Sequence, residues 1–92
     1  MGSIRYAADA VADLAALRNY IAQRNPDAAR RVADRIVKSV TRLAQHPRLG
    51  KPGRVDGTRE LVISKFPYVI CYVEEEGDCL VLRILHQAMQ WP

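Results

Sequence analysis

The stretch of residues 67–86, PYVICYVEEEGDCLVLRILH, decides the fold of this chain. Residues 67–74 are rich in β-branched and aromatic residues, a composition that favours a β-strand, and residues 79–86 are mostly apolar. The acidic segment of residues 75–78 between them contains Gly77 and indicates a turn. We therefore expect an antiparallel β-hairpin with strands over residues 67–74 and 79–86.

The register of this hairpin follows if Glu74 and Cys79 form its closing pair. One face then carries six apolar or thiol side chains: Val69, Cys71, Val73, Leu80, Leu82 and Ile84. The other carries two tyrosines, one arginine and three aliphatic residues: Tyr68, Ile70, Tyr72, Val81, Arg83 and Leu85. We expect the first face to lie under helices. Cys71 and Cys79 would point to opposite faces, which argues against a disulfide.

The residues before the hairpin predict a short strand, two helices and a further strand. Residues 3–6 suit a strand, and residues 8–24 carry apolar side chains at helical spacing, including Val11, Leu14 and Tyr20. Asn25 and Pro26 suit the cap and first position of a second helix, which we expect to reach residue 45. Its apolar side is Ala29, Val32, Ile36, Val40 and Leu43. Residues 48–57 indicate a loop and residues 59–64 a strand.

The predicted order is therefore β-α-α-β-β-β in a single domain over residues 1–92. The expected class is α+β, an antiparallel sheet with an N-terminal helical hairpin packed on one face.

The second face of the sheet has no remaining segment of regular structure to cover it. Exposed apolar surface of this kind marks binding sites. We expect a partner-binding surface here, extended by the C-terminal tail: Tyr68, Ile70, Tyr72, Val81, Arg83, Leu85, Met89 and Trp91. The alternatives are cover by the loop and the tail, or self-association.

The composition narrows the class of protein. The net charge of +4 suggests an acidic partner, either nucleic acid or an acidic protein. Two cysteines without metal-ligand spacing suggest reduced thiols in the cytoplasm, and we expect neither a metal nor a cofactor. We expect no membrane association, because the sequence contains no apolar run of about 20 residues.

Several short motifs resemble one known family. Arg59-Glu60-Leu61 follows the Gly-rich loop, Pro67-Tyr68 begins a strand, and Leu82-Arg83-Ile84-Leu85-His86 lies near the C-terminus. The helical part carries four further motifs: Asp13-Leu14, Tyr20-Ile21, the Pro26 helix start and the His46-Pro47…Gly50 turn. In this order, they resemble the ParE/RelE superfamily of toxins from type II toxin–antitoxin modules. The closer match is the ParE-like branch, the plasmid stabilisation system toxins.

The resemblance implies a cytoplasmic toxin that a cognate antitoxin neutralises with an acidic or amphipathic C-terminal segment. It also implies one of two targets. ParE-like toxins inhibit DNA gyrase by binding it, whereas RelE-like toxins are endoribonucleases that cleave mRNA on the ribosome. A third interpretation is a relative that binds antitoxin but is not toxic, because Gln87 stands where many relatives have glycine.

If the chain were a nuclease, the resemblance would assign its catalysis to Arg83, His86, Lys65 and Arg59, with Lys51 nearby in the loop. Cations would stabilise the charge on the phosphate and the imidazole would transfer a proton. No tyrosine follows Tyr72, so the C-terminal tyrosine of some RelE-like enzymes is missing. We therefore favour a gyrase inhibitor that is not an enzyme.

Overall fold

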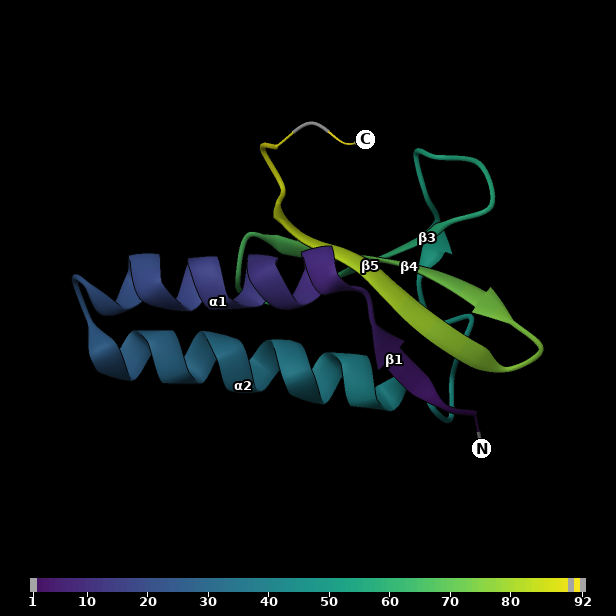
Figure 1. Ribbon diagram of the computed structural model, residues 1–92, viewed down its shortest axis with the longest axis horizontal. Coiled ribbons are helices and arrows are strands. Elements are labelled where there is room, and N and C mark those ends of the chain that lie inside the picture. Colours follow the sequence, from purple (N-terminus) through teal and green to yellow (C-terminus); the bar gives the residue numbers. More distant parts are fainter. Residues whose placement is uncertain (1, 90, 92) are drawn as a thin grey trace.

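The computed structural model describes residues 2–89 and 91 as two helices and five strands. The elements are β1 (Ile4–Tyr6), α1 (Ala8–Ala22), α2 (Pro26–Arg42), β2 (Lys51–Pro52), β3 (Arg59–Val62), β4 (Tyr68–Glu75) and β5 (Asp78–His86). The strands form one sheet in the order β1-β5-β4-β3-β2, with the helical hairpin packed on one side (Figure 1). The α+β prediction is confirmed.

Two details of the sheet differ from the prediction of four antiparallel strands. The short strand β2 lies inside the segment expected to be a loop, and β1 pairs with β5 in parallel. The Ala7 N–H donates to the Val81 carbonyl and the Cys79 N–H donates to the Ser3 carbonyl, which ties both ends of β1 to β5. A three-residue strand carries too little sequence pattern to specify its neighbour or its direction.

Helix α2 follows its predicted pattern. The Asn25 side chain accepts a hydrogen bond from the Ala28 N–H at 3.1 Å, and Pro26 is the first helical residue. Both features satisfy or remove N–H groups that lack partners inside the helix. The five residues predicted for its apolar side are all buried: Ala29, Val32, Ile36, Val40 and Leu43.

Helix α1 follows its pattern only in part. Leu17 is buried and Leu14 packs against the same core, but Val11 and Tyr20 are 54% and 64% exposed. The prediction that Val11 and Tyr20 belong to the buried side is wrong. The end of the helical hairpin around the α1–α2 connection extends beyond the strands (Figure 1).

The β4–β5 hairpin closes as predicted and then changes register. Glu76 and Gly77 both have positive φ, 54° and 88°, as a two-residue type I′ turn requires. Glu74 pairs with Cys79, and the predicted register holds as far as the Tyr72–Val81 pair. A β-bulge follows, so that Cys71 pairs with Arg83 and Leu82 becomes the extra residue.

The assignment of the two sheet faces is wrong. Ile70, Tyr72 and Val81, expected on the uncovered face, lie in the main core under the helices, each 0% exposed, and Tyr68 packs partly buried against the same core. Ile84 also lies there, 3% exposed, although strict alternation would place it opposite Val81. The bulge explains this, because one extra residue between Val81 and Ile84 returns the strand to the same face.

Tyr72 can lie in the core because its hydroxyl has partners there. It accepts a hydrogen bond from the Gly50 N–H at 2.8 Å and donates one to the Pro47 carbonyl at 2.9 Å. A Cβ on Gly50 would lie 2.8 Å from the Tyr72 ring, so only glycine allows the loop to approach so closely. This contact fastens the loop after α2 to the sheet.

The second face of the sheet is covered in part by the chain itself. Val69, Cys71 and Leu85 form a second buried cluster, against which Trp91 packs. The C-terminal tail, of which the structure describes residues 87–89 and 91, and the teal connection before β3 lie on the side of the sheet away from the helices (Figure 1). Cover by loop and tail, the alternative raised from the sequence, is therefore correct for this region. Cys71 and Cys79 lie in different clusters and are free, as predicted.

Candidate partner-binding surface

One ion pair joins α1 to the bulge of β5. The Arg83 guanidinium donates two hydrogen bonds to the Asp13 carboxylate, at 2.7 Å and 3.0 Å. The Ile84 N–H, two residues after the extra residue of the bulge, donates a third at 2.9 Å. A bulge interrupts the hydrogen-bond ladder, and here the Asp13 carboxylate serves as acceptor for this N–H group. Asp13 thereby stabilises both the arginine and the irregular strand.

This contact changes the interpretation of Arg83. The sequence predicts Arg83 to lie on a partner-binding face. In the structure its counter-ion is Asp13, and its side chain is 30% exposed. Hydrogen bonding to Asp13 raises the pKa of Arg83, so the guanidinium remains charged and paired. A fork that already binds one carboxylate is poorly available to a phosphate.

Glu60 is paired with a different arginine. It is 6% exposed on β3 and accepts hydrogen bonds from the Arg54 N–H at 2.8 Å and from Arg54 Nε at 3.1 Å. Arg54 Nη1 also donates to the Met89 carbonyl at 3.3 Å. Burial alone would raise the pKa of Glu60, but these bonds from Arg54 outweigh it and lower the pKa. Arg54 therefore ties the loop to β3 and to the tail.

Glu60→Gln is expected to reduce the loss of stability in acid. Because the pKa of Glu60 in the folded state is below its unfolded value of about 4.3, Glu60 contributes stability above that pH. The contribution is lost as the pH falls through the folded-state pKa. Urea unfolding at about pH 7 and about pH 3 should show a deficit of the variant at the higher pH that shrinks at the lower. Glu76→Gln, at the exposed hairpin turn, is the control, and a Glu60→Gln deficit independent of pH would contradict the assignment.

Cys71 lies beneath the tail in the second cluster, 1% exposed. Burial, followed by the neighbouring Glu60 carboxylate, raises the pKa of the Cys71 thiol to about 11. The thiol is therefore protonated at neutral pH, and only the thiolate is nucleophilic. Cys71 is a packing residue in this arrangement.

Trp91→Ala is expected to speed the alkylation of Cys71 by iodoacetamide about tenfold, because the tail would then open more often. Cys79, which is buried on the helix side of the sheet, is the internal control. Peptide mass spectrometry distinguishes the two thiols. Equal acceleration at both cysteines would mean global destabilisation, and no change at Cys71 would mean that Trp91 does not protect it.

The residues assigned to a possible nuclease do not converge. Arg59 pairs with Tyr72 and His86 pairs with Tyr68, four residues apart on β4, which corresponds to about 13 Å along the strand. Arg59 Nη1 donates to the Gly50 carbonyl at 2.7 Å, and His86 Nδ1 accepts from the Ala88 N–H at 3.1 Å. Lys65 is exposed in the turn between β3 and β4, with φ of 74°.

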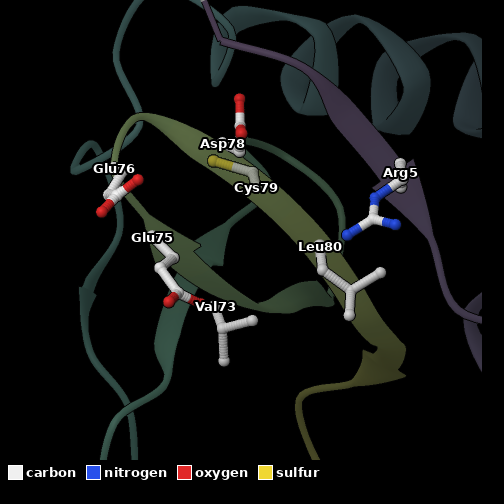
Figure 2. A pocket seen from close by; sticks show the side chains of 7 residues that line it. All are labelled: Arg5, Val73, Glu75, Glu76, Asp78, Cys79 and Leu80. Atoms are coloured by element: carbon white, nitrogen blue, oxygen red, sulfur yellow. The ribbon is translucent and has the colours of Figure 1, made fainter.

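One part of the second face remains open near the β4–β5 turn. Figure 2 shows side chains from β1, β4 and β5 around a hollow of about 220 Å³. Arg5 is exposed on β1, and its guanidinium extends toward Leu80 of β5, while Val73 and Glu75 project from β4. Val73 and Leu80 are half-buried. The hollow thus combines an apolar floor with a rim of one cation and three acidic residues.

The described residues offer little for other chemistries. No group of three His, Cys, Asp or Glu side chains in residues 2–89 and 91 could hold a metal ion. Within the same part of the chain, neither helix is long and apolar enough to cross a membrane.

Comparisons with known proteins agree with one another. Residues 4–91 match the family described as the ParE toxin of type II toxin-antitoxin system, parDE. The chain is 42% identical over 89 residues to Y4kP of Sinorhizobium fredii, a candidate toxin, covering 97% of this chain and 92% of that protein. It is also 42% identical over 79 residues to Toxin RelE2 of Caulobacter vibrioides, covering 86% and 88%.

A solved structure supports the same assignment. A chain of the chromosomal ParDE TA system from P. aeruginosa superimposes with a TM-score of 0.81 at 27% identity, covering 94% of this chain and 96% of that one. The Asp13–Arg83 contact joins two of the motifs that carried the resemblance, which lie 70 residues apart in the sequence. From the family match over residues 4–91, the chain belongs to the ParE toxins of type II toxin–antitoxin systems.

Proposed function

We propose that this toxin inhibits DNA gyrase by binding it, without a catalytic reaction of its own. The observation that carries the proposal is the dispersal of the candidate nuclease residues. RNA cleavage requires cations and a proton donor around one phosphate. Here Arg83 is paired with Asp13, and Arg59 of β3 and His86 of β5 pair with residues four positions apart on β4.

The purified chain should be tested against both targets. We expect gyrase-dependent cleavage of supercoiled plasmid DNA and intact mRNA in a translation extract. Cleavage of mRNA that requires ribosomes would overturn the proposal and favour the RelE-like activity. No effect in either assay, together with normal growth on expression, would favour a relative without toxicity.

We further propose that the hollow near the β4–β5 turn binds an amphipathic segment of the cognate antitoxin. Val73 and Leu80 would receive apolar side chains, and Arg5 would pair with a carboxylate at the edge. Since the lining also holds three acidic residues, a segment with mainly apolar contacts and few carboxylates fits it better than an acidic one. Met89, which is 51% exposed, lies on the tail that borders the same face of the sheet.

Arg5→Glu is expected to weaken copurification of the antitoxin and its ability to rescue growth. Arg18→Glu, an equal charge reversal on an exposed residue of α1, is the control. Arg5 is exposed, so its replacement should leave the fold intact, which circular dichroism can check. Equal retention of antitoxin by both variants would show that the binding surface lies elsewhere.

A further inference from the structure

Helix α2 presents a line of cations on its outer side. Arg31, Arg35, Lys38 and Arg42 follow one another at intervals of four, three and four residues, and all are exposed. Such spacing places them on one side of the helix, away from the buried residues listed above. At a rise of about 1.5 Å per residue, the line is roughly 16 Å long. We call these four residues the α2 basic ridge.

The charges of this ridge are not neutralised within the described part of the chain. Arg30, Arg48, Arg54 and Arg83 each form an ion pair with a carboxylate, whereas none of the four ridge residues does. Asp34 lies beside the ridge on the same helix, but no ion pair joins it to a ridge residue. Four cations on one side of α2 therefore have no carboxylate partner among the described residues.

A groove adjoins the ridge. It has a volume of about 310 Å³ and lies between α2 and the end of β3. Its lining is cationic, hydroxylic and aliphatic, with no acidic residue among the described ones: Arg35, Lys38, Ser39, Arg42, Leu61, Val62 and Ser64. Arg35 is held at its edge by the Phe66 ring, 5.9 Å from the guanidinium carbon, and by a long contact of 3.5 Å with the Ser64 carbonyl. Several Arg35 N–H groups remain free to donate.

These features fit a chain of phosphate groups. Arginine forks and hydroxyls are donors that suit phosphate oxygens. One strand of B-DNA presents a charge about every 3.4 Å along its axis, so a straight ridge of this length meets several phosphates whatever the sequence. An acidic peptide would match it only where its carboxylates happened to recur at this spacing. The uniform sign and regular spacing of the cations therefore favour nucleic acid.

We propose that the α2 basic ridge and its groove bind the phosphate backbone of a nucleic acid without reading its sequence. The proposal does not depend on which macromolecule the toxin inhibits. DNA and RNA both qualify as the source of these phosphates, because both carry the same phosphodiester. Binding should be weak at physiological salt and should strengthen steeply as salt is lowered.

The test is fluorescence anisotropy of the purified chain with labelled duplex DNA and, in parallel, duplex RNA of the same sequence. The Lys38→Ala/Arg42→Ala variant is expected to bind at least about tenfold more weakly at about 50 mM salt, with a salt slope smaller by nearly two. Arg18→Ala/Arg24→Ala removes the same charge from exposed positions outside the ridge and should change neither quantity comparably. Tighter binding to one of the two duplexes identifies that nucleic acid as the source of the phosphates.

Three results would overturn the proposal. The two double variants could weaken binding equally, which would mean that only net charge matters. The chain could fail to bind either duplex even at low salt. Polyglutamate could displace the labelled duplex as well as unlabelled duplex of equal charge does, which would identify an acidic protein as the partner. The gyrase assay is separate, so its failure would leave these outcomes interpretable.

Discussion

Asp13→Ala is expected to lower the free energy of unfolding by about 2 kcal/mol, and the melting temperature by about 10 °C. The change removes three acceptor contacts at once and leaves the Arg83 guanidinium and the Ile84 N–H without a partner. Losing one member of a fully buried pair costs about 3–5 kcal/mol. The smaller value applies because the Arg83 side chain is 30% exposed and water can solvate it in part.

The measurement is urea unfolding of Asp13→Ala beside Asp34→Ala, which removes an exposed acid from α2. The control should change stability by less than about 0.5 kcal/mol. If both variants behaved alike, the bulge of β5 would not depend on Asp13. Asp13→Asn should recover part of the loss, because its amide oxygen can still accept from the Ile84 N–H.

Ile36→Ala is expected to cost about 3–4 kcal/mol, the largest effect of any single change proposed for this chain. Ile36 is 0% exposed in the main core between α2 and the sheet. The loss combines the transfer of buried methylene groups to water with a cavity that the neighbouring residues cannot fill. A domain of this size has a total stability of roughly 5–14 kcal/mol, so a large part would disappear.

Val37→Ala provides a matched control for Ile36→Ala. Val37 is the next residue on the same helix and is 42% exposed. Alanine there should be nearly neutral, because it removes little buried surface and is a better helix former. Similar unfolding midpoints for the two variants would show that α2 does not pack through the side assigned to it.

The predictions that succeeded rest on local chemistry. The cap at Asn25 and the buried side of α2 follow from spacing and side-chain type along one segment. The turn at Gly77 and the first three pairs of the hairpin likewise depend on neighbouring residues. Cys71 and Cys79 lie on opposite faces of the sheet, as predicted, although the faces themselves were assigned wrongly. Each cysteine lies on the face opposite to the one predicted for it, so their relation is unchanged.

The candidate site was harder to predict, because its residues are brought together from distant segments. Tyr72 was placed on a partner-binding face, since nothing local shows that Gly50 and Pro47 bind its hydroxyl. Arg83 was expected to contact a partner, whereas its counter-ion is Asp13, 70 residues away in the sequence. A signal for Asp13 was present: an acid beside Ala10 and Leu14 on the apolar side of a helix suggests a buried cation nearby.

The sequence by itself determined the element types, the α+β class and the family resemblance, because helical and strand periodicity and turn chemistry act over a few residues. The tertiary structure alone decided which face of the sheet lies under the helices. Because both faces are apolar, alternation along the strands does not make that choice. The extra residue Leu82 then brings Ile84 to the same side as Val81, and the Asp13 carboxylate accepts a hydrogen bond from the Ile84 N–H. The tertiary structure also decided which arginines are paired, since ion pairs form between side chains that folding brings within 4 Å, however far apart they lie in the chain.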